Sequence, residues 1–204
     1  MSSAGRGRRS TTEGLPDDEL AAAAKAGDRD ALESLLRRHH DRLYALARRL
    51  VGNPDDALDA TQDALLAISR GLHRFDGRSS FGTWAYRVAT NACFDELRRR
   101  RRRPEPTEEE ATGVSAPTAD VVAEGAARRL DVDAALATLP DEFRAPVVLR
   151  DLCGLDYAEI AEVLELRPGT VRSRIARGRA ALAAQLGEDE GNHSPTGERR
   201  RRQG

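Results

Sequence analysis

The stretch from Asp156 to Leu182 constrains the fold of this chain more than any other part of its sequence. A short segment with helical periodicity opens at Asp156, a turn of four to five residues follows, and a second, longer segment runs to Leu182. This spacing predicts a helix-turn-helix, whose second helix enters the major groove of DNA.

The second helix of this unit should have one packing face and one basic face. At about 100° per residue its apolar positions gather on one side, at Val171, Ile175, Gly178 and Leu182. The opposite side carries Thr170, Ser173, Arg174, Arg177 and Ala181, with Arg172 and Arg179 on the flank. No acid lies between Thr170 and Leu186, whereas a solvated helix face normally mixes both signs of charge. Because guanidinium groups suit guanine edges and phosphates, we favour DNA binding over an amphipathic core helix with a solvated arginine face.

The charge of the chain is balanced in total but unevenly distributed. Charged residues make up 33% of the 204 residues and the net charge is −1, yet arginines cluster at 98–103, 172–179 and 199–202. Such local asymmetry indicates the partners of a protein better than its total charge does. With 39% hydrophobic and 4% aromatic residues, the cores should be small and rich in Ala, Leu and Val.

Cysteine use and hydropathy indicate a reduced, cytoplasmic protein without a cofactor. Cys93 and Cys153 are far apart, each within an expected helix, and make neither a disulfide framework nor a metal site. His39 and His40 have no accompanying metal-ligand motif. No apolar run approaches the ~18 residues of a membrane span, and Met1–Glu13 is too polar and basic for a secretory signal.

The first 54 residues predict a tail and two helices. Residues 1–14 should be disordered; a short helix then runs to about Ala26, and a longer one runs from an Asp28 cap to about Val51. The triplet Gly52-Asn53-Pro54 combines a helix-ending glycine, an N-cap and a proline at a first helical position.

The next helix, from Asp55 to Ser69, should have two different faces. Its expected packing face holds Ala57, Leu58, Thr61, Ala64, Leu65 and Ile68. Another face gathers Asp55, Asp59, Gln62, Asp63 and Leu66. Early acids favour the helix dipole, which accounts for Asp55 and Asp56 but not for the later polar residues. An exposed leucine among carboxylates is typical of a docking face for a basic partner surface.

A basic, glycine-rich loop at 71–80 precedes a helix from Phe81 to about Arg101, which Ser79 or Ser80 can cap. Its expected packing stripe is Phe81, Ala85, Val88 and Ala92, flanked by Trp84 and Ala89. Another side carries Thr83, Arg87, Thr90, Asn91, Phe94 and Arg98. Aromatic rings that stack on bases, beside arginines that hold phosphates, suit single-stranded nucleic acid, although core packing is the simpler account of most of the Trp84 surface. We interpret the arginine run 98–103 as a phosphate-contacting tail rather than a solvated helix end.

Residues 104–125 change in composition and predict a flexible acidic linker between two small helical domains. The second domain begins near Ala126 with a helix that stops at Leu139-Pro140; its inward residues should be Leu130, Ala134, Leu136 and Ala137. The helix from Asp141 to Leu152 should turn inward Phe143, Val147, Val148 and Leu152, and Pro146 should kink it. Residues 188–204 should form a second disordered tail.

Four motifs occur together and in a fixed order, at Asp55–Leu66, Phe81–Ala92, Leu139–Pro140 and Pro168–Arg174. In this ordered set the chain resembles the extracytoplasmic-function (ECF) sigma factors over about residues 17–187. The region from Asp55 to Cys93 is most similar to the SigM-type subgroup.

The resemblance implies an all-α protein with sigma region 2 at 15–103 and region 4 at 126–187. It implies that the docking face binds the β′ clamp helices of core RNA polymerase through Asp55, Asp56, Asp59, Gln62, Asp63 and Leu66. It implies that the −10 element is opened, and a flipped base held, by Phe75, Ser79, Ser80, Thr83, Trp84, Arg87, Asn91 and Arg98. It implies that the −35 duplex is read by Thr170, Arg172, Ser173, Arg174, Arg177 and Arg179.

The resemblance further implies a non-catalytic initiation factor for a stress or envelope regulon. Its expected partners are core RNA polymerase, including the β flap, double- and single-stranded promoter DNA, and an anti-sigma factor. It would act in the bacterial cytoplasm, on the nucleoid through the polymerase. Consistent with this, the chain carries no phosphate loop, nucleophile elbow or metal-ligand cluster.

Two residues depart from the family pattern. Glu165 stands at the turn of the helix-turn-helix, where the family usually has glycine; a left-handed backbone there would cost roughly 1–2 kcal/mol. Pro146 interrupts an expected helix.

Two alternatives to the sigma-factor hypothesis stay open at this point. An ordinary helix-turn-helix regulator would use residues 17–103 for sensing or dimerisation, and a sensing domain needs a pocket that the sequence does not predict. An adaptor or anti-sigma antagonist would bind only protein, which the acid-free recognition helix and the arginine run disfavour.

Overall fold

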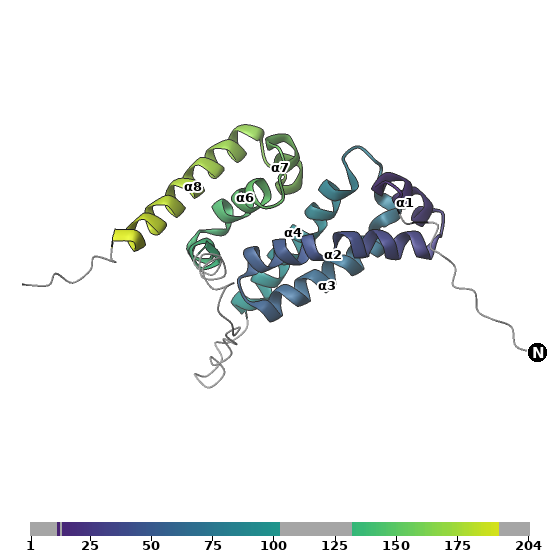
Figure 1. Cartoon of the computed structure of the whole chain (residues 1–204), viewed down its shortest axis with the longest axis horizontal. Coiled ribbons are helices and arrows are strands. Elements are labelled where there is room, and N and C mark those ends of the chain that lie inside the picture. The colour runs from purple at the N-terminus through teal and green to yellow at the C-terminus, as the bar shows by residue number, and fades with distance from the viewer. Residues whose placement is uncertain (1–11, 13, 103–131, 192–204) are drawn as a thin grey trace, which may run out of the picture.

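The computed structural model describes residue 12 and residues 14–102 and 132–191, with side chains described up to Leu186. Within these ranges the chain forms helices joined by turns, and no strand occurs. Figure 1 shows two groups of helices, an N-terminal unit built from residues 14–102 and a C-terminal unit built from residues 132–191. The predicted all-α class with two small helical units is confirmed, whereas the expected linker 104–125 lies outside the described residues.

The N-terminal unit consists of α1 (Asp17–Lys25), α2 (Arg29–Val51), α3 (Pro54–Gly71), a 3-10 turn η1 (Leu72–Arg74) and α4 (Phe81–Arg102). The predicted caps are confirmed. The Asp28 carboxylate accepts hydrogen bonds from the backbone N–H groups of Asp30 and Ala31, and the Asn53 side chain accepts from those of Asp55 and Asp56. These bonds satisfy donors that a helix start otherwise leaves unpaired. Because α3 extends to Gly71 and η1 follows, the loop expected at 71–80 shortens to residues 75–80.

The core of the N-terminal unit lies where α2, α3 and α4 meet. Most of its buried leucines come from α2, and α3 contributes mainly small residues, Ala57, Ala60 and Ala64. Leu58 is 45% exposed, so its assignment to the packing face was wrong. On α4 the fully buried stripe is Phe81, Ala85, Ala89 and Cys93, while Val88 and Ala92 are half-buried. The centre of this stripe is therefore rotated towards the residues that we had placed on its flank.

Two positions of the predicted N-terminal tail, Thr12 and Gly14, are described by the structure. Thr12 is buried, and its hydroxyl shares a hydrogen bond of 2.8 Å with the Ser34 hydroxyl on α2. The prediction of disorder is thus wrong for Thr12, and residues 1–11 and 13 lie outside the described ranges.

The C-terminal unit contains a helical stretch at 132–138, then α6 (Asp141–Asp151), α7 (Tyr157–Leu164) and α8 (Pro168–Gly191). α6 is continuous through Pro146, where we expected a kink. Leu152, expected inward, is 41% exposed because the helix has ended before it. Leu136 is buried as predicted, whereas Ala134 and Ala137, also expected inward, are exposed. Ala135 and Leu139 are buried in their place. α8 continues to Gly191, into the segment 188–204 that we expected to be disordered.

The turn between α7 and α8 has a left-handed backbone at Glu165, the position where glycine would be expected. Glu165 adopts φ 54° and ψ 43°, a conformation that costs a non-glycine residue roughly 1–2 kcal/mol. At the other end of α7, Asp156 and Glu159 form a reciprocal capping box that offsets part of this cost. Cys153, expected within a helix, lies instead in the turn after α6.

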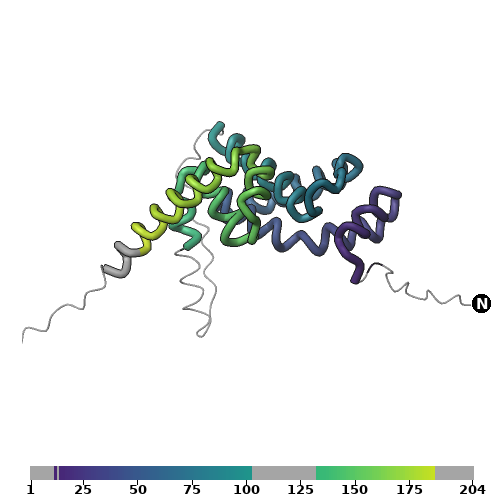
Figure 2. The backbone as a smooth tube through the Cα atoms, turned by 90° about the horizontal axis from the view of Figure 1, so that it is seen from above, coloured from purple at the N-terminus to yellow at the C-terminus, as the bar shows by residue number. Residues whose placement is uncertain are grey.

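The two units pack against each other, α4 beside α7 and α2 beside α6. Arg144 on α6 is buried, and its guanidinium donates hydrogen bonds to four backbone carbonyls, those of Leu136, Ala137, Leu139 and, across the boundary, Leu50. Burial lowers the pKa of Arg144, and Asp141 opposes that shift. Asp141 also pairs with Arg101 at 2.6 Å. In both views α8 extends away from the N-terminal unit (Figure 1, Figure 2).

Candidate nucleic-acid interface

The acidic face of α3 is exposed as expected. Asp55, Asp59, Gln62 and Asp63 are exposed, and Leu66 is 52% exposed among them. Asp56 differs from the rest, because its side chain is only 15% exposed and lies 3.4 Å from Arg100 of α4. Asp63 accepts a 2.6 Å hydrogen bond from Arg99, which raises the pKa of that arginine. The α3 face therefore presents a leucine ringed by carboxylates, two of which are shared with α4.

The aromatic residues expected to stack on bases are packed together. Phe75 and Trp84 are 6% and 7% exposed, and their ring centroids lie 5.4 Å apart. Phe81 completes the cluster at 5.7 Å from Phe75 and 5.6 Å from Trp84. Most of the surface of Phe75 and Trp84 thus belongs to the core, which confirms the core account that the sequence favoured for Trp84. In this arrangement Phe75 offers no free ring face for stacking.

The loop before α4 is anchored at its end by Ser80, which caps the helix. The Ser80 hydroxyl accepts a hydrogen bond of 3.1 Å from the Thr83 backbone N–H. Ser79 is half-buried and does not serve as the cap. Upstream, Asp76 accepts a hydrogen bond from the Arg78 N–H, and Gly77 has φ +74°. A tight loop thus leads from the aromatic cluster into α4.

The C-terminal unit covers part of the polar side of α4. Thr83 is 3% exposed, and its hydroxyl donates a 2.9 Å hydrogen bond to the Glu159 carboxylate of α7. Arg87 lies 3.9 Å from Glu162, also on α7. Thr90, one turn further along, is fully buried. We expected this side of α4 to face nucleic acid. That expectation is wrong for Thr83 while α7 lies against it, and Thr90 is buried as well.

Asn91 and Arg98 remain exposed on α4. Arg98 pairs with Asp95 on its own helix, and the arginines that follow it also have acidic partners. Arg99 contacts Asp63 and Glu96, Arg100 contacts Asp56, and Arg101 contacts Asp141. The pairs of Arg98 with Asp95 and of Arg99 with Asp63 are exposed on both sides. Exposed ion pairs contribute little stability and exchange readily, so phosphates can compete for these two arginines. Arg103 lies outside the described residues.

The basic face of α8 is exposed, but its arginines differ in their surroundings. Arg174 lies 3.2 Å from Glu142, and Arg179 pairs with Asp151, both acids belonging to α6. The Asp151 hydrogen bond raises the pKa of Arg179. Arg172 lies over the Tyr157 ring at 5.5 Å. Arg177 and Ser173 are exposed, and Arg177 forms no ion pair within the described part of the chain.

Several interface residues escaped the sequence analysis. Glu159 could be identified as a helix cap from its spacing to Asp156, but nothing local indicates its bond to Thr83. Arg144 stands in an apolar segment, where a lone arginine is the signal of a buried partner. Its four carbonyl partners come from three separate parts of the fold.

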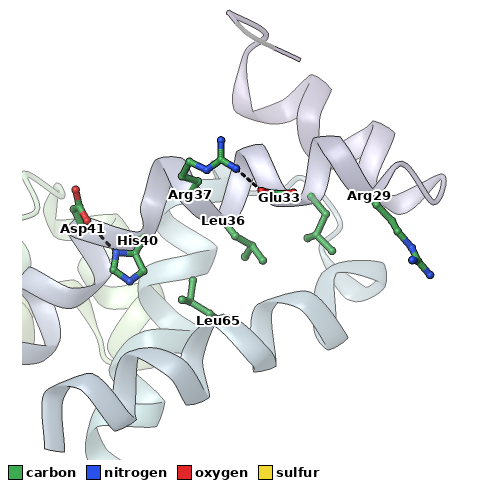
Figure 3. Close-up of a pocket in the computed structure, with 8 residues that line it drawn as sticks. Arg29, Glu33, Leu36, Arg37, His40, Asp41 and Leu65 are labelled. Carbon is green, nitrogen blue, oxygen red and sulfur yellow. Dashed lines mark hydrogen bonds and ion pairs between the residues drawn. The ribbon is translucent and has the colours of Figure 1, made fainter. Parts of the chain in front are cut away.

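A groove of about 580 Å³ lies between α2 and α3. Figure 3 shows Leu36 of α2 and Leu65 of α3 pointing toward each other across it. Arg29, Glu33, Arg37, His40 and Asp41 line it as well. The sequence predicted no pocket here, and that prediction is wrong. Among the described residues no group of His, Cys, Asp and Glu side chains could hold a metal ion, and none of the described helices is long and apolar enough to cross a membrane.

Comparison with protein families matches both units. Residues 35–103 match the family model of sigma-70 region 2, and residues 129–182 match that of sigma-70 region 4. The ECF RNA polymerase sigma factor SigM of Mycobacterium tuberculosis is 43% identical over 171 residues, which is 84% of this chain and 85% of the relative. The ECF RNA polymerase sigma factor SigW of Bacillus subtilis is 34% identical over 79% of this chain and 92% of its own length.

Among solved structures, CnrH in complex with the cytosolic domain of CnrY is similar, with a TM-score of 0.66 and 29% identity over 85% of this chain and 98% of that one. The sigma factor RpoE of Bartonella quintana, solved with the anti-sigma factor NepR, has a TM-score of 0.60 at 22% identity over 77% of this chain and 97% of that one. The latter similarity concerns the fold alone.

Proposed function

The chain belongs to the ECF sigma factors of the sigma-70 family, and from that membership we propose how its surfaces divide the work of promoter recognition. Residues 15–103 act as region 2 and residues 126–187 as region 4. The α3 face around Leu66 docks on the β′ clamp helices, the 75–80 loop and α4 open the −10 element, and α8 reads the −35 duplex.

The observation that carries this proposal is the separation of charge between two exposed helix faces. α3 presents carboxylates around a leucine that is 52% exposed, which suits a basic protein surface with an apolar centre. α8 presents Arg172, Ser173 and Arg177 with no acid on the same face, which suits base edges and phosphates. One chain with both faces can bridge a protein and a duplex.

The −10 surface requires a change of arrangement. The carboxylates of Glu159 and Glu162 on α7 contact Thr83 and Arg87 of α4. α7 must therefore move away from α4 before Thr83 and Arg87 can contact DNA. The hydrogen bonds across the boundary include those of Thr83 to Glu159, Arg101 to Asp141 and Arg144 to the Leu50 carbonyl. Relative motion is the usual behaviour of domains joined by polar contacts. Core polymerase binding, through α3 and the β flap, would favour the separated form by binding it more tightly than the packed one.

Opening of the −10 element by this route needs no ATP. A flipped base and a bound single strand offset an unstacking cost of a few kcal/mol. Some of the proposed −10 residues are accessible without any movement of α7. Ser80, Asn91 and Arg98 are exposed, and Ser79 is half-buried. Phe75 and Trp84 support this surface from beneath and contact a base only through their outer edges.

The family relationship also supports the remaining partners. As a member of the ECF sigma factors, this chain has an anti-sigma partner in our proposal, with a stress or envelope regulon under its control. As an RNA polymerase subunit it acts in the bacterial cytoplasm, and on the nucleoid when the polymerase is there. Sigma factors are non-catalytic, and this chain has no enzymatic step of its own in our proposal.

A run-off transcription assay with core RNA polymerase and a genomic promoter library tests the proposal. The expected result is a heparin-resistant open complex on a subset of promoters that contain both elements. An ordinary helix-turn-helix regulator would bind duplex DNA alone and form no such complex. Because a groove lies between α2 and α3, the lack of a pocket is no longer an argument against a sensing domain. The transcription assay therefore distinguishes a sigma factor from an ordinary helix-turn-helix regulator.

A further inference from the structure

The first helix of the chain, α1, lies outside the residues that match the region 2 family model, which begin at residue 35. It nevertheless packs on α2, η1 and α4. In Figure 1 it lies at the end of α2 beside the connection from α3 to α4. That connection is the 75–80 loop, which our proposed function assigns to the −10 element.

The last residue of α1 holds the start of this loop. Lys25 is the only lysine of the chain, and its Nζ donates a 2.7 Å hydrogen bond to the carbonyl oxygen of Phe75. Phe75 is the residue at which η1 ends and the backbone becomes extended, with φ −66° and ψ 114°. An ammonium donor makes this bond stronger than one between neutral groups.

The first residue of α1 holds the far end of the loop through His39. One oxygen of Asp17 lies 2.7 Å from His39 Nε2, and the other accepts a 2.6 Å hydrogen bond from Arg38. Burial tends to raise the pKa of Asp17, but the hydrogen bonds from Arg38 and His39 outweigh it and the net shift is downward. The His39 ring is 3% exposed and meets the Phe81 ring edge to face, with centroids 5.0 Å apart.

Phe81 is the first residue of α4, so both ends of the loop are tied to the two ends of one helix. A nine-residue helix spans roughly 12 Å at about 1.5 Å per residue, and its length therefore fixes the separation of the two anchors. Between these two anchors, Leu20 and Ala21 of α1 are buried and pack the helix onto the unit.

We infer that α1 is a brace for the −10 loop, with Lys25 and the Asp17–His39 pair as positioning residues that set where Ser79 and Ser80 stand. This inference rests on the proposed function of the loop. Neither Lys25 nor Asp17 touches DNA in this role; each acts through the backbone or the side chain that it holds. A loop that is already ordered before binding does not pay the entropy of ordering when it binds single-stranded DNA, and its affinity is therefore higher.

The test compares Lys25→Met, which keeps the aliphatic stem and removes the donor, with Lys25→Arg, which keeps a cationic donor. The probe is a single-stranded DNA pool with six randomised positions, from which unmodified holoenzyme selects its best −10 sequence. We expect holoenzyme with Lys25→Met to bind the selected oligonucleotide about tenfold more weakly, as for loss of one charge-assisted hydrogen bond. Lys25→Arg should stay within about threefold of the unmodified protein, because it retains the donor.

Two further readouts separate positioning from direct contact. Hydrogen exchange at the amides of residues 76–80 should speed up in full-length Lys25→Met and stay unchanged elsewhere in the N-terminal unit. The salt dependence of oligonucleotide binding should keep its slope, because a lost phosphate contact would lower the slope by about one charge and a lost brace would not. A lowered slope with unchanged exchange means that Lys25 contacts phosphate directly and overturns the inference.

The remaining outcomes are also decisive. If Lys25→Met leaves both hydrogen exchange and oligonucleotide affinity unchanged, the inference that α1 is a brace is overturned. It is also overturned if Lys25→Met weakens core-polymerase binding as much as oligonucleotide binding, because that indicates a general defect. If unmodified holoenzyme selects no sequence at all, the assignment of the loop to the −10 element fails. In that case the exchange measurement still decides whether Lys25 holds the loop.

Discussion

The hydroxyl of Thr83 on α4 donates a 2.9 Å hydrogen bond to the carboxylate of Glu159 on α7, across the boundary between the two helical units. One turn further along each helix, Arg87 lies 3.9 Å from Glu162. The acids of α7 therefore stand where the phosphates of the −10 strand would be expected in our proposal. The same glutamate caps α7, so helix stability and domain packing depend on one side chain.

Replacing Glu159 with Gln should shift the two units toward separation. Glutamine still suits the third position of a capping box, but it lacks the charge that strengthens the bond to Thr83. We expect a larger average distance between fluorophores placed on α2 and α8, measured by energy transfer in the free protein. Glu142→Gln is the matched control, because Glu142 pairs with Arg174 inside the C-terminal unit. Equal distances in both variants would contradict the role of Glu159 at the boundary.

Combining Asp59→Arg with Gln62→Ala should abolish binding to core RNA polymerase. Both residues are exposed on the α3 face beside Leu66, so the fold should tolerate the change, while a reversed charge opposes a basic partner surface. Co-purification with tagged core polymerase measures the effect. Glu19→Arg reverses a charge on α1 and should leave binding intact; undiminished co-purification of the double variant would refute the docking face.

Arg177→Ala should weaken −35-dependent initiation by ~1–3 kcal/mol, as for loss of a bidentate base contact. Arg177 is exposed and is not committed to an ion pair within the described residues, unlike Arg179, which is bound to Asp151. The variant Arg179→Ala should therefore have the smaller effect. Initiation rates on promoters with and without a −35 element provide the measurement, and equal losses on both promoter types would exclude a role in −35 reading.

Trp84→Ala should destabilise the N-terminal unit by about 3–5 kcal/mol, the cost of emptying a large aromatic site. The indole packs against Phe75 and Phe81 and also faces Gly71, where an added Cβ would lie 3.7 Å from the ring. Thermal unfolding measures this loss. A premelted bubble template, used below the unfolding temperature, should rescue any part of the transcription defect that comes from opening. Full rescue with unchanged unfolding would show that Trp84 acts on DNA and not on the core.

Glu165→Gly should raise the stability of the C-terminal unit by roughly 1 kcal/mol, since glycine relieves the left-handed strain but loses more chain entropy on folding. The φ of 54° at Glu165 is the only positive φ among non-glycine residues in the described ranges. Chemical denaturation followed by a probe on α8 measures the change. Glu142→Gly, in the first turn of α6, should lower stability instead. A destabilised Glu165→Gly variant would mean that the side chain contributes more than its backbone costs.

The local features of this protein follow from short stretches of its sequence. The Asp28 and Asn53 caps and the turn at Glu165 each depend on residues within a few positions of one another, and this is why they could be identified in advance. The Asp156 capping box is equally local, but we did not predict it. The exposed faces of α3 and α8 also followed from helical periodicity, since each is a property of a single helix.

The burial of a residue by a second helix could not be predicted from the periodicity of its own helix. Periodicity gives Leu58 and Leu152 an inward position, but no described helix covers either one. It gives Thr83 and Thr90 an outward position, but both are buried, Thr83 beneath α7. Periodicity did place Gly178 on the packing face of α8, but it did not predict the closeness of α6, where an added Cβ would come within 2.7 Å of Val147 Cγ2.

The sequence by itself thus determined the helices, their caps, the turn and the family. Only the tertiary structure decided which helix faces meet, that Arg144 joins the two units through the Leu50 carbonyl, and that α1 reaches the −10 loop. The physical reason is range: a cap or a turn is stabilised by neighbours along the chain, whereas contacts such as Lys25 to Phe75 join residues that only the packing of the whole unit brings together.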